Sequence, residues 1–458
     1  MHTCRSLYHA GIPHLLFHNI NIRTRAKLLS FCRFILTDPS RFRFLRHLDI
    51  SVPGRFKTPR KADLLLAMFM YAHQLQQLRI FDCEILDSHY QIPFAIAALT
   101  SLKSLTLHLP NDSAYQMLKC MRSDIVKMDI CFYRDDEVPQ DPVPLLSCLC
   151  HSLQELRVTY AHFECAVGQY YPSLRTLVVD DCQFAKVEPL AESFPNASDL
   201  SLWMGQEDDN LEVNEIEECR SINQTAQDNV GWDGLDRLRG DILSLYMLGL
   251  RCQVYHLDVQ STFLTSPRSS QLRAVLSDSR PSMFSVRINA VKFEMSFLPP
   301  MLEPVRETLT HLIVYMDLSD SSDEPDGMLA SDFPLIGFAS LQTADSSSFY
   351  PQHGLLASLQ FLDISFLVLN VCWDTTDQLP QHPTEAYLEH MEFEKMARAA
   401  KRCVSSLRYF VIDSGRRPMS FWDVSHSERG TRPLSAEEGW LMLAKEGVSI
   451  GYDLAGCD

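Results

Sequence analysis

The residues that could carry covalent or metal chemistry are numerous in this chain of 458 residues, but their spacing matches no known site. The sequence holds 14 cysteines and 16 histidines. It contains no G-x-S-x-G, G-x-x-x-x-G-K-[ST], G-x-G-x-x-G or H-E-x-x-H pattern. The closest cysteine pair, Cys148 and Cys150, has no second pair at zinc-finger spacing. We therefore expect no catalytic, cofactor-binding or metal-binding residues, and reduced thiols without a disulfide framework.

Two acidic segments are interpreted as loops. Asp317 to Asp326 spaces its acids as a calcium loop does, but Ser322 stands where that loop needs glycine and Met328 where it needs glutamate. We expect a solvated loop open to phosphorylation.

Residues 205–231 hold eight acids and a single base, Arg220. Their few apolar side chains cannot offset an ordering entropy of about 1–2 kcal/mol per residue, so we expect a mobile acidic insertion.

Arginine and aromatic residues recur one and three places after a series of apolar anchors. In a strand these positions point away from the side on which the anchors are buried. Tryptophan, tyrosine and arginine are also the types enriched in protein-binding hot spots. The residues at these positions are Arg79, Phe81, His108, Arg157, Trp203, Arg287 and Tyr315. We predict that they form a protein-binding concave face; the alternative, that each lies singly along its neighbour, stays open.

The element that must position these residues is a short strand that recurs along the chain. Residues 174–184 read LRTLVVDDCQF and residues 75–85 read LQQLRIFDCEI, and both fit the leucine-rich-repeat template L-x-x-L-x-L-x-x-[N/C]-x-L. We find fourteen such units, most of them 19 to 30 residues apart. Their middle anchors are Leu48, Leu78, Leu105, Met128, Leu156, Leu177, Leu200, Leu238, Leu257, Val286, Leu312, Leu341, Leu362 and Phe410.

One such strand cannot bury its own apolar side, so the copies must stack. The sequence therefore predicts an α/β fold: a leucine-rich-repeat solenoid, or horseshoe, of about fourteen irregular repeats. A parallel sheet lines its concave side and helices line its convex side. We assign residues 1–44 to an N-terminal cap, residues 45–412 to the solenoid and residues 413–458 to a C-terminal cap. The predicted helices are 60–73, 91–99, 114–121 with a cap at Asp112 or Ser113, 384–403 and 435–445.

Charge is distributed unevenly along the chain. The formal net charge is −17, yet residues 1–61 hold 12 lysines and arginines against 2 aspartates, a net +10 that leaves −27 for the rest. An acidic body argues against general binding of nucleic acid. The best apolar run, residues 64–72, is too short to cross a membrane. We expect no nucleic-acid or membrane partner, and a location in the cytoplasm or nucleus.

The first residues resemble part of a known module. Residues 2–16, HTCRSLYHAGIPHLL, are similar to the closing helix of an F-box, in which a Cys-Arg pair, an aromatic residue and a Leu-Leu pair lead into the first repeat. With the repeats behind it, the chain resembles the fungal F-box/leucine-rich-repeat proteins. In that family the F-box binds a Skp-type adaptor of a cullin–RING ubiquitin ligase, and the repeats present the substrate.

The resemblance implies roles for residues near the N-terminus. The adaptor side would include Cys4, Arg5, Leu7, Tyr8, Leu15 and Leu16. The basic charge of residues 1–61 would suit an acidic adaptor. The alternative is that Leu7, Leu15 and Leu16 cap the solenoid. A full F-box begins with a Leu-Pro-x-Glu-Ile-like helix that nothing before Met1 supplies, so we expect an incomplete gene product or a copy that has lost adaptor binding.

The leading hypothesis is a substrate-recognition subunit, or degenerate relative, of an SCF-type ubiquitin ligase with an unknown protein substrate. The rival is an adaptor-free leucine-rich-repeat scaffold that binds another protein. A third hypothesis, a small-molecule sensor, rests only on the concavity of the predicted fold.

Overall fold

The computed structural model describes residues 5–134, 140–164, 168–181, 186–203, 212–260, 266–289, 297–317, 355–372, 392–415, 417–425 and 430–448. The chain divides into two compact units. Unit 1 comprises Met1–Leu235 with Met247–Gly249, and unit 2 comprises Asp236–Tyr246 with Leu250–Asp458. The division falls inside the stretch that the sequence assigns to one solenoid.

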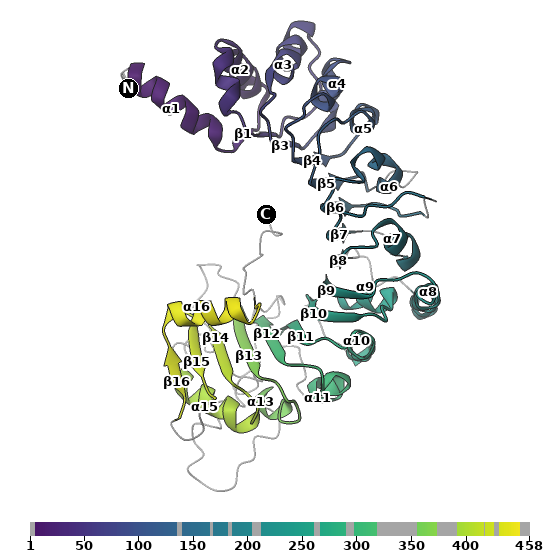
Figure 1. Ribbon diagram of the computed structural model, residues 1–458, viewed down its shortest axis with the longest axis vertical. Helices are drawn as coiled ribbons and strands as arrows, with labels where there is room; N and C mark the ends of the chain where they lie inside the picture. Colours follow the sequence, from purple (N-terminus) through teal and green to yellow (C-terminus); the bar gives the residue numbers. More distant parts are fainter. Residues whose placement is uncertain are drawn as a thin grey trace, which may run out of the picture. The chain divides into compact units, whose positions relative to one another are not determined.

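Unit 1 is built on strands that lie side by side in the order of the chain (Figure 1). They are β1 (Ile20–Ile22), β2 (His47–Ile50), β3 (Gln77–Ile80), β4 (Ser104–His108), β5 (Lys127–Cys131), β6 (Glu155–Thr159), β7 (Thr176–Asp180) and β8 (Asp199–Trp203). Every neighbouring pair among them is parallel. β1 was not predicted, because its three residues are too few to show a repeat pattern.

The predicted anchors of unit 1 form one continuous row across the sheet. Leu48 pairs with Leu78, and the row then runs through Leu105, Met128, Leu156, Leu177 and Leu200. All seven side chains are at most 1% exposed. A slip of one residue would turn a strand's apolar side chains to the other face, so this row fixes the register of the sheet.

The chain between these strands returns through helices that pack against one another on one side of the sheet (Figure 1). They are α2 (Arg25–Leu36), η1 (Pro39–Phe44), α3 (Pro59–Tyr71), η2 (Cys83–Ser88), α4 (Ile92–Ala97), α5 (Asp112–Lys119), α6 (Pro142–Leu145), η3 (Ser147–Leu149), α7 (Val187–Ser193) and α8 (Val213–Ala226). α1 (Arg5–Phe17) precedes β1 and contacts η1. α3, α4 and α5 confirm three predicted helices. The cap of α5 is Asn111, whose side chain accepts from the Ala114 N–H, and not Asp112 or Ser113.

α8 shows that the prediction of a mobile loop is wrong for residues 213–226. Asn223 in α8 is 1% exposed; its side-chain oxygen accepts from the Val187 N–H, and its amide donates to the Met247 carbonyl. One side chain thus satisfies two buried backbone groups, which the low apolar content did not reveal. α8 takes the place of a repeat's returning helix. The preceding residues 204–211 lie outside the described part of the chain.

Unit 2 contains the remaining strands and helices. Its strands are β9 (Gly234–Gly240), which begins two residues before the division, β10 (Gln253–Val259), β11 (Met283–Asn289), β12 (His311–Asp317), β13 (Phe366–Cys372), β14 (Tyr409–Asp413), β15 (Ser420–Asp423) and β16 (Arg432–Leu434). Its helices are α9 (Ile242–Leu248), which ends in unit 1, α10 (Ser266–Ser279), α11 (Leu298–Leu302), η6 (Glu303–Val305), α13 (Leu355–Ser358), α15 (Phe393–Cys403) and α16 (Ala436–Lys445).

The strands from β10 to β14 are parallel, whereas β15 and β16 join antiparallel. Their anchor row is Leu257, Phe284, Leu312, Leu367 and Phe410. Two predicted anchors are therefore misplaced. Val286 lies in β11 but two residues beyond the row, and Leu362 is buried before β13 begins. Leu341, the loop at residues 318–326 and the first part of the predicted 384–403 helix lie outside the described residues.

The predicted fold class is confirmed: an α/β leucine-rich-repeat solenoid of parallel strands and returning helices. The terminal helix expected at 435–445 is also present. α16 begins after Ser435, which forms a capping box with Glu438.

The buried anchor row yields a first prediction. Leu177→Asp places a carboxylate among fully buried leucines, so we expect the free energy of unfolding to fall by about 3 kcal/mol or more. Because repeats contact mainly their neighbours, amide hydrogen exchange should rise most between β6 and β8.

Val178→Asp is the matched control, because Val178 is the next residue and points to the other face of the sheet, where it is only half-buried. Unchanged exchange between β6 and β8 in Leu177→Asp would show that Leu177 is not a core anchor.

Candidate protein-interaction surface

The side chains between the anchors of unit 1 lie on the sheet face opposite its helices, which we call the open face of unit 1. One row, one place after the anchors, consists of Asp49, Arg79, Thr106, Asp129, Arg157, Val178 and Ser201. A second row, three places after them, includes His108, Cys131, Thr159, Asp180 and Trp203. Phe81 follows β3 at the same place. All five of the unit 1 residues predicted for this face lie in these two rows.

Two ion pairs lie on the open face of unit 1. Arg157 donates from both Nε and Nη2 to Oδ2 of Asp180, each at 2.8 Å. Lys127 pairs with Glu155 at 2.6 Å. Burial raises the pKa of Asp129 and of Asp180, while Arg157 acts to lower both. The face therefore offers fixed charges of alternating sign.

An aromatic pair lies beside these charges. Phe81 is 38% exposed and stacks on His108, with ring centroids 4.5 Å apart and an interplanar angle of 28°. Burial lowers the pKa of His108, with Asp129 opposing and Arg79 reinforcing the shift. His108 is therefore harder to protonate than a free histidine and, with Phe81, provides a flat, mostly apolar surface beside the charged residues.

Three residues at one end of these strands adopt left-handed backbone conformations that bulky side chains rarely take. Leu109, Tyr160 and Asp181 have φ of 52°, 58° and 51°, and each directly follows its strand. The N–H of Leu109 still bonds the Cys131 carbonyl at 2.8 Å, and that of Tyr160 bonds the Asp180 carbonyl at 3.1 Å. The neighbouring strands thus hold these turns in place, which gives the open face a fixed rim next to His108 and Asp180.

In unit 2 the equivalent face is covered over several strands by the C-terminal helix. Met283, Ile313, Phe366, Val368, Val411 and Phe421 form one buried cluster with Met442 and Leu443 of α16 and with Val448. Figure 1 shows α16 lying across the strands of this part of the sheet. The predicted partner residue Tyr315 packs against this cluster, and Arg287 lies over its ring at 6.0 Å. Tyr315 is thus part of a packed core and not a freely exposed contact residue.

Gly439 permits this close approach of α16 to the sheet. A Cβ built on Gly439 would lie only 2.2 Å from Cγ of Phe421. His311 of β12 adds a polar contact, because its Nε2 lies 3.4 Å from Oε2 of Glu446 just beyond the helix. The outer side of α16 presents Trp440 and Leu441, which are 51% and 71% exposed.

The residues that the resemblance assigns to an adaptor are only partly described. Arg5, Leu7 and Tyr8 lie on α1, whose first residues are described as backbone only, and Cys4 lies outside the described residues. Leu16 is 1% exposed and belongs to the core, whereas Leu15 is 70% exposed. Of the Leu-Leu pair, Leu15 alone is free to contact another protein.

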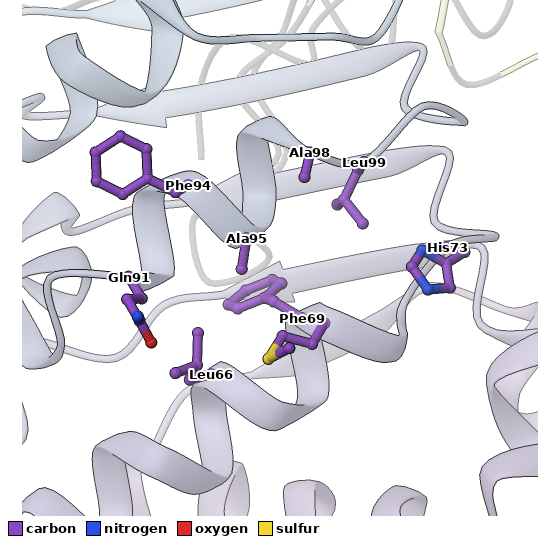
Figure 2. Close-up of a pocket in the computed structure, with 9 residues that line it drawn as sticks. Leu66, Phe69, His73, Gln91, Phe94, Ala95, Ala98 and Leu99 are labelled. Atoms are coloured by element: carbon purple, nitrogen blue, oxygen red, sulfur yellow. The ribbon is translucent and has the colours of Figure 1, made fainter.

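A separate apolar pocket lies among the helices of unit 1. Leu66, Phe69 and Met70 of α3 face Phe94 and Ala95 of α4 across a cavity of about 370 Å³, with His73 and Gln91 at its edges (Figure 2). The pocket was not predicted, since it depends on how two helices pack. Among the described residues, no group of three or more histidine, cysteine or carboxylate side chains is arranged to hold a metal ion, and no helix is long and apolar enough to span a bilayer.

The contact between α16 and the sheet yields a second prediction. Gly439→Leu should displace α16, because its side chain would occupy the space of the Phe421 ring. We expect faster amide exchange in residues 436–448 and on β13 and β14, with a change in Trp440 fluorescence. Ala444→Leu adds the same side chain to an exposed position of the same helix and should leave all three unchanged. Native exchange in Gly439→Leu would contradict this packing.

In comparisons with known proteins, no family model and no curated protein matches this chain. Among solved structures, it is similar to the leucine-rich-repeat-containing protein LegL7 from Legionella pneumophila, with 10% identity, coverage of 90% of this chain and 95% of that one, and a TM-score of 0.32. It is also similar to TLR13 in its complex with ssRNA13, with 12% identity, coverage of 72% and 50%, and a TM-score of 0.30.

Proposed function

We propose that this protein is a protein-interaction module that binds a partner protein on the open face of unit 1. The observation that carries the proposal is the uncovered surface formed by the Phe81–His108 pair and the charged rows beside it. Aromatic and arginine side chains on a rigid, register-locked sheet lose little conformational freedom on binding. The paired charges impose an orientation on the partner, because a displaced partner would meet charges of the same sign.

More specifically, we propose that the protein is a substrate-recognition subunit, or degenerate relative, of an SCF-type cullin–RING ubiquitin ligase, and that it acts in the cytoplasm or nucleus. This finer proposal rests on the resemblance of residues 2–16 to the end of an F-box. The exposure of Leu15 on α1 is compatible with an adaptor contact. In this arrangement, unit 1 would bind the adaptor near its N-terminal end and the substrate on its open face.

The general proposal predicts that Phe81→Ala weakens capture of the native partner by about tenfold or more, because aromatic hot-spot side chains contribute about 2 kcal/mol or more. The measurement is quantitative affinity purification of the full chain from its native cells. Tyr90→Ala is the control: Tyr90 is 73% exposed and also stacks on a histidine, His89, but lies between η2 and α4. Equal capture by Phe81→Ala and the unchanged protein would contradict a binding role for this face.

The finer proposal predicts that a Skp-type adaptor co-purifies with the full chain and is lost in Leu15→Asp. Leu441→Asp provides the control, because Leu441 is 71% exposed on a different helix, against 70% for Leu15. If no adaptor co-purifies, but the capture of other proteins is weakened by Phe81→Ala, the chain is an adaptor-free scaffold.

A further inference from the structure

Two arginines of unit 2 share a single carboxylate oxygen. Arg237 and Arg239 project from β9, and both donate to Oδ2 of Asp258 on β10, at 2.8 and 3.0 Å. The strands are held together at this point, since the Gln260 N–H donates to the Gly240 carbonyl at 3.1 Å. Asp258 is only 6% exposed. The carboxylate is thus fixed from two sides by guanidinium groups.

The charges of this cluster are not balanced. Arg287 of β11 adds a third guanidinium to the same face, two residues beyond Ser285, which pairs with Asp258 across the strands. Within the part of the chain that the structure describes, no second carboxylate lies within ion-pair distance of Arg237, Arg239 or Arg287. Three positive charges therefore face one negative charge.

The cluster also has more hydrogen-bond donors than acceptors. Each guanidinium carries five N–H donors and accepts nothing. Arg237 keeps its buried Nε–H without an acceptor. His256, which lies beside Asp258, bonds to Ser285 Oγ at 2.8 Å and supplies no negative charge. An added anion would thus meet unsatisfied donors as well as uncompensated charge.

This part of the sheet face is accessible. The side chains of Arg237 and Arg239 are 29% and 21% exposed. The described cluster beneath α16 begins at Met283 of β11 and includes no residue of β9 or β10. Arg287 lies at the border, where its guanidinium is over the ring of Tyr315. The arginines therefore form a cationic patch beside the helix-covered part of the face.

We infer that Arg237, Arg239 and Arg287 form an anion-binding site for carboxylate side chains of an acidic segment in the protein partner. This inference rests on the proposed function, because it assigns the anion to that partner. Arginine is suited to the role, since its planar group binds a carboxylate through two parallel N–H donors. In a chain whose residues after 61 carry a net charge of −27, a local cationic patch also attracts an acidic segment.

The test measures binding of a fluorescent peptide with three consecutive glutamates, flanked by glycine and serine, to the full chain at low salt. We expect saturable binding that weakens as salt increases and is absent for the peptide with glutamines in place of glutamates. Arg239→Gln should weaken binding by about tenfold or more, since it removes a charge-assisted contact while Arg237 still pairs with Asp258. Arg306→Gln removes an exposed arginine next to η6 and should bind the peptide as the unchanged protein does.

Arg287→Gln keeps the test decisive if Arg239→Gln fails to fold, because Arg287 does not contact Asp258; we expect it to weaken binding as well. No binding by the unchanged protein, or equal binding by the arginine variants and Arg306→Gln, would overturn the anion site and mean that the arginines only tie β9 to β10. Such a result would leave the proposed function standing, because that function is measured separately through Phe81 and the native partner.

Discussion

The structure depends on the apolar row that crosses each unit, because a strand of three to seven residues cannot bury its own apolar side chains. In unit 1 the row from Leu48 to Leu200 joins strands that are 21 to 30 residues apart in sequence. Each leucine is desolvated by the repeat before it and the repeat after it. Every other side chain is placed relative to this row, including those on the open face. The strand positions that hold Arg79 and Arg157 are therefore fixed by buried leucines that no partner would touch.

The sheet face opposite the returning helices is partly exposed in unit 1 and covered over several strands in unit 2. In unit 1, β3 and β7 alternate between buried and half-buried residues, so one face meets solvent. In unit 2, residues 366–371 of β13 are buried throughout, as expected of a strand covered on both faces. That second cover is α16, and Gly439 is the residue that lets it lie close to Phe421. A sheet face that is apolar along its whole length requires such a cover, whereas a face with alternating polarity can remain open for a partner.

What could be predicted from the sequence follows from the range over which each interaction acts. The anchors of unit 1 could be placed to the residue, because strand alternation and repeat spacing are local patterns. Val286 was misplaced because Phe284, Val286 and Ile288 alternate along β11 and each fits the template. Leu362 was misplaced because apolar residues continue from it into β13. α8 was missed because one buried amide, Asn223, stabilises its packing and leaves no periodic signal. The apolar run at residues 366–369 was the available signal for burial on both faces, and it indicates the cover without identifying α16.

For the candidate surface, alternation showed which side chains face away from the anchors but not how they interact. Neighbouring strands place residues of one row about 5 Å apart, so charges in a row act on one another strongly. In unit 1, the strands carry five acids against three bases, and Arg157 is compensated by Asp180. In unit 2, one aspartate compensates two arginines, and a third arginine stands two residues further along the next strand. The same repeat geometry therefore gives one face on which acids outnumber bases and two ion pairs can orient a partner, and another whose excess positive charge attracts an anion.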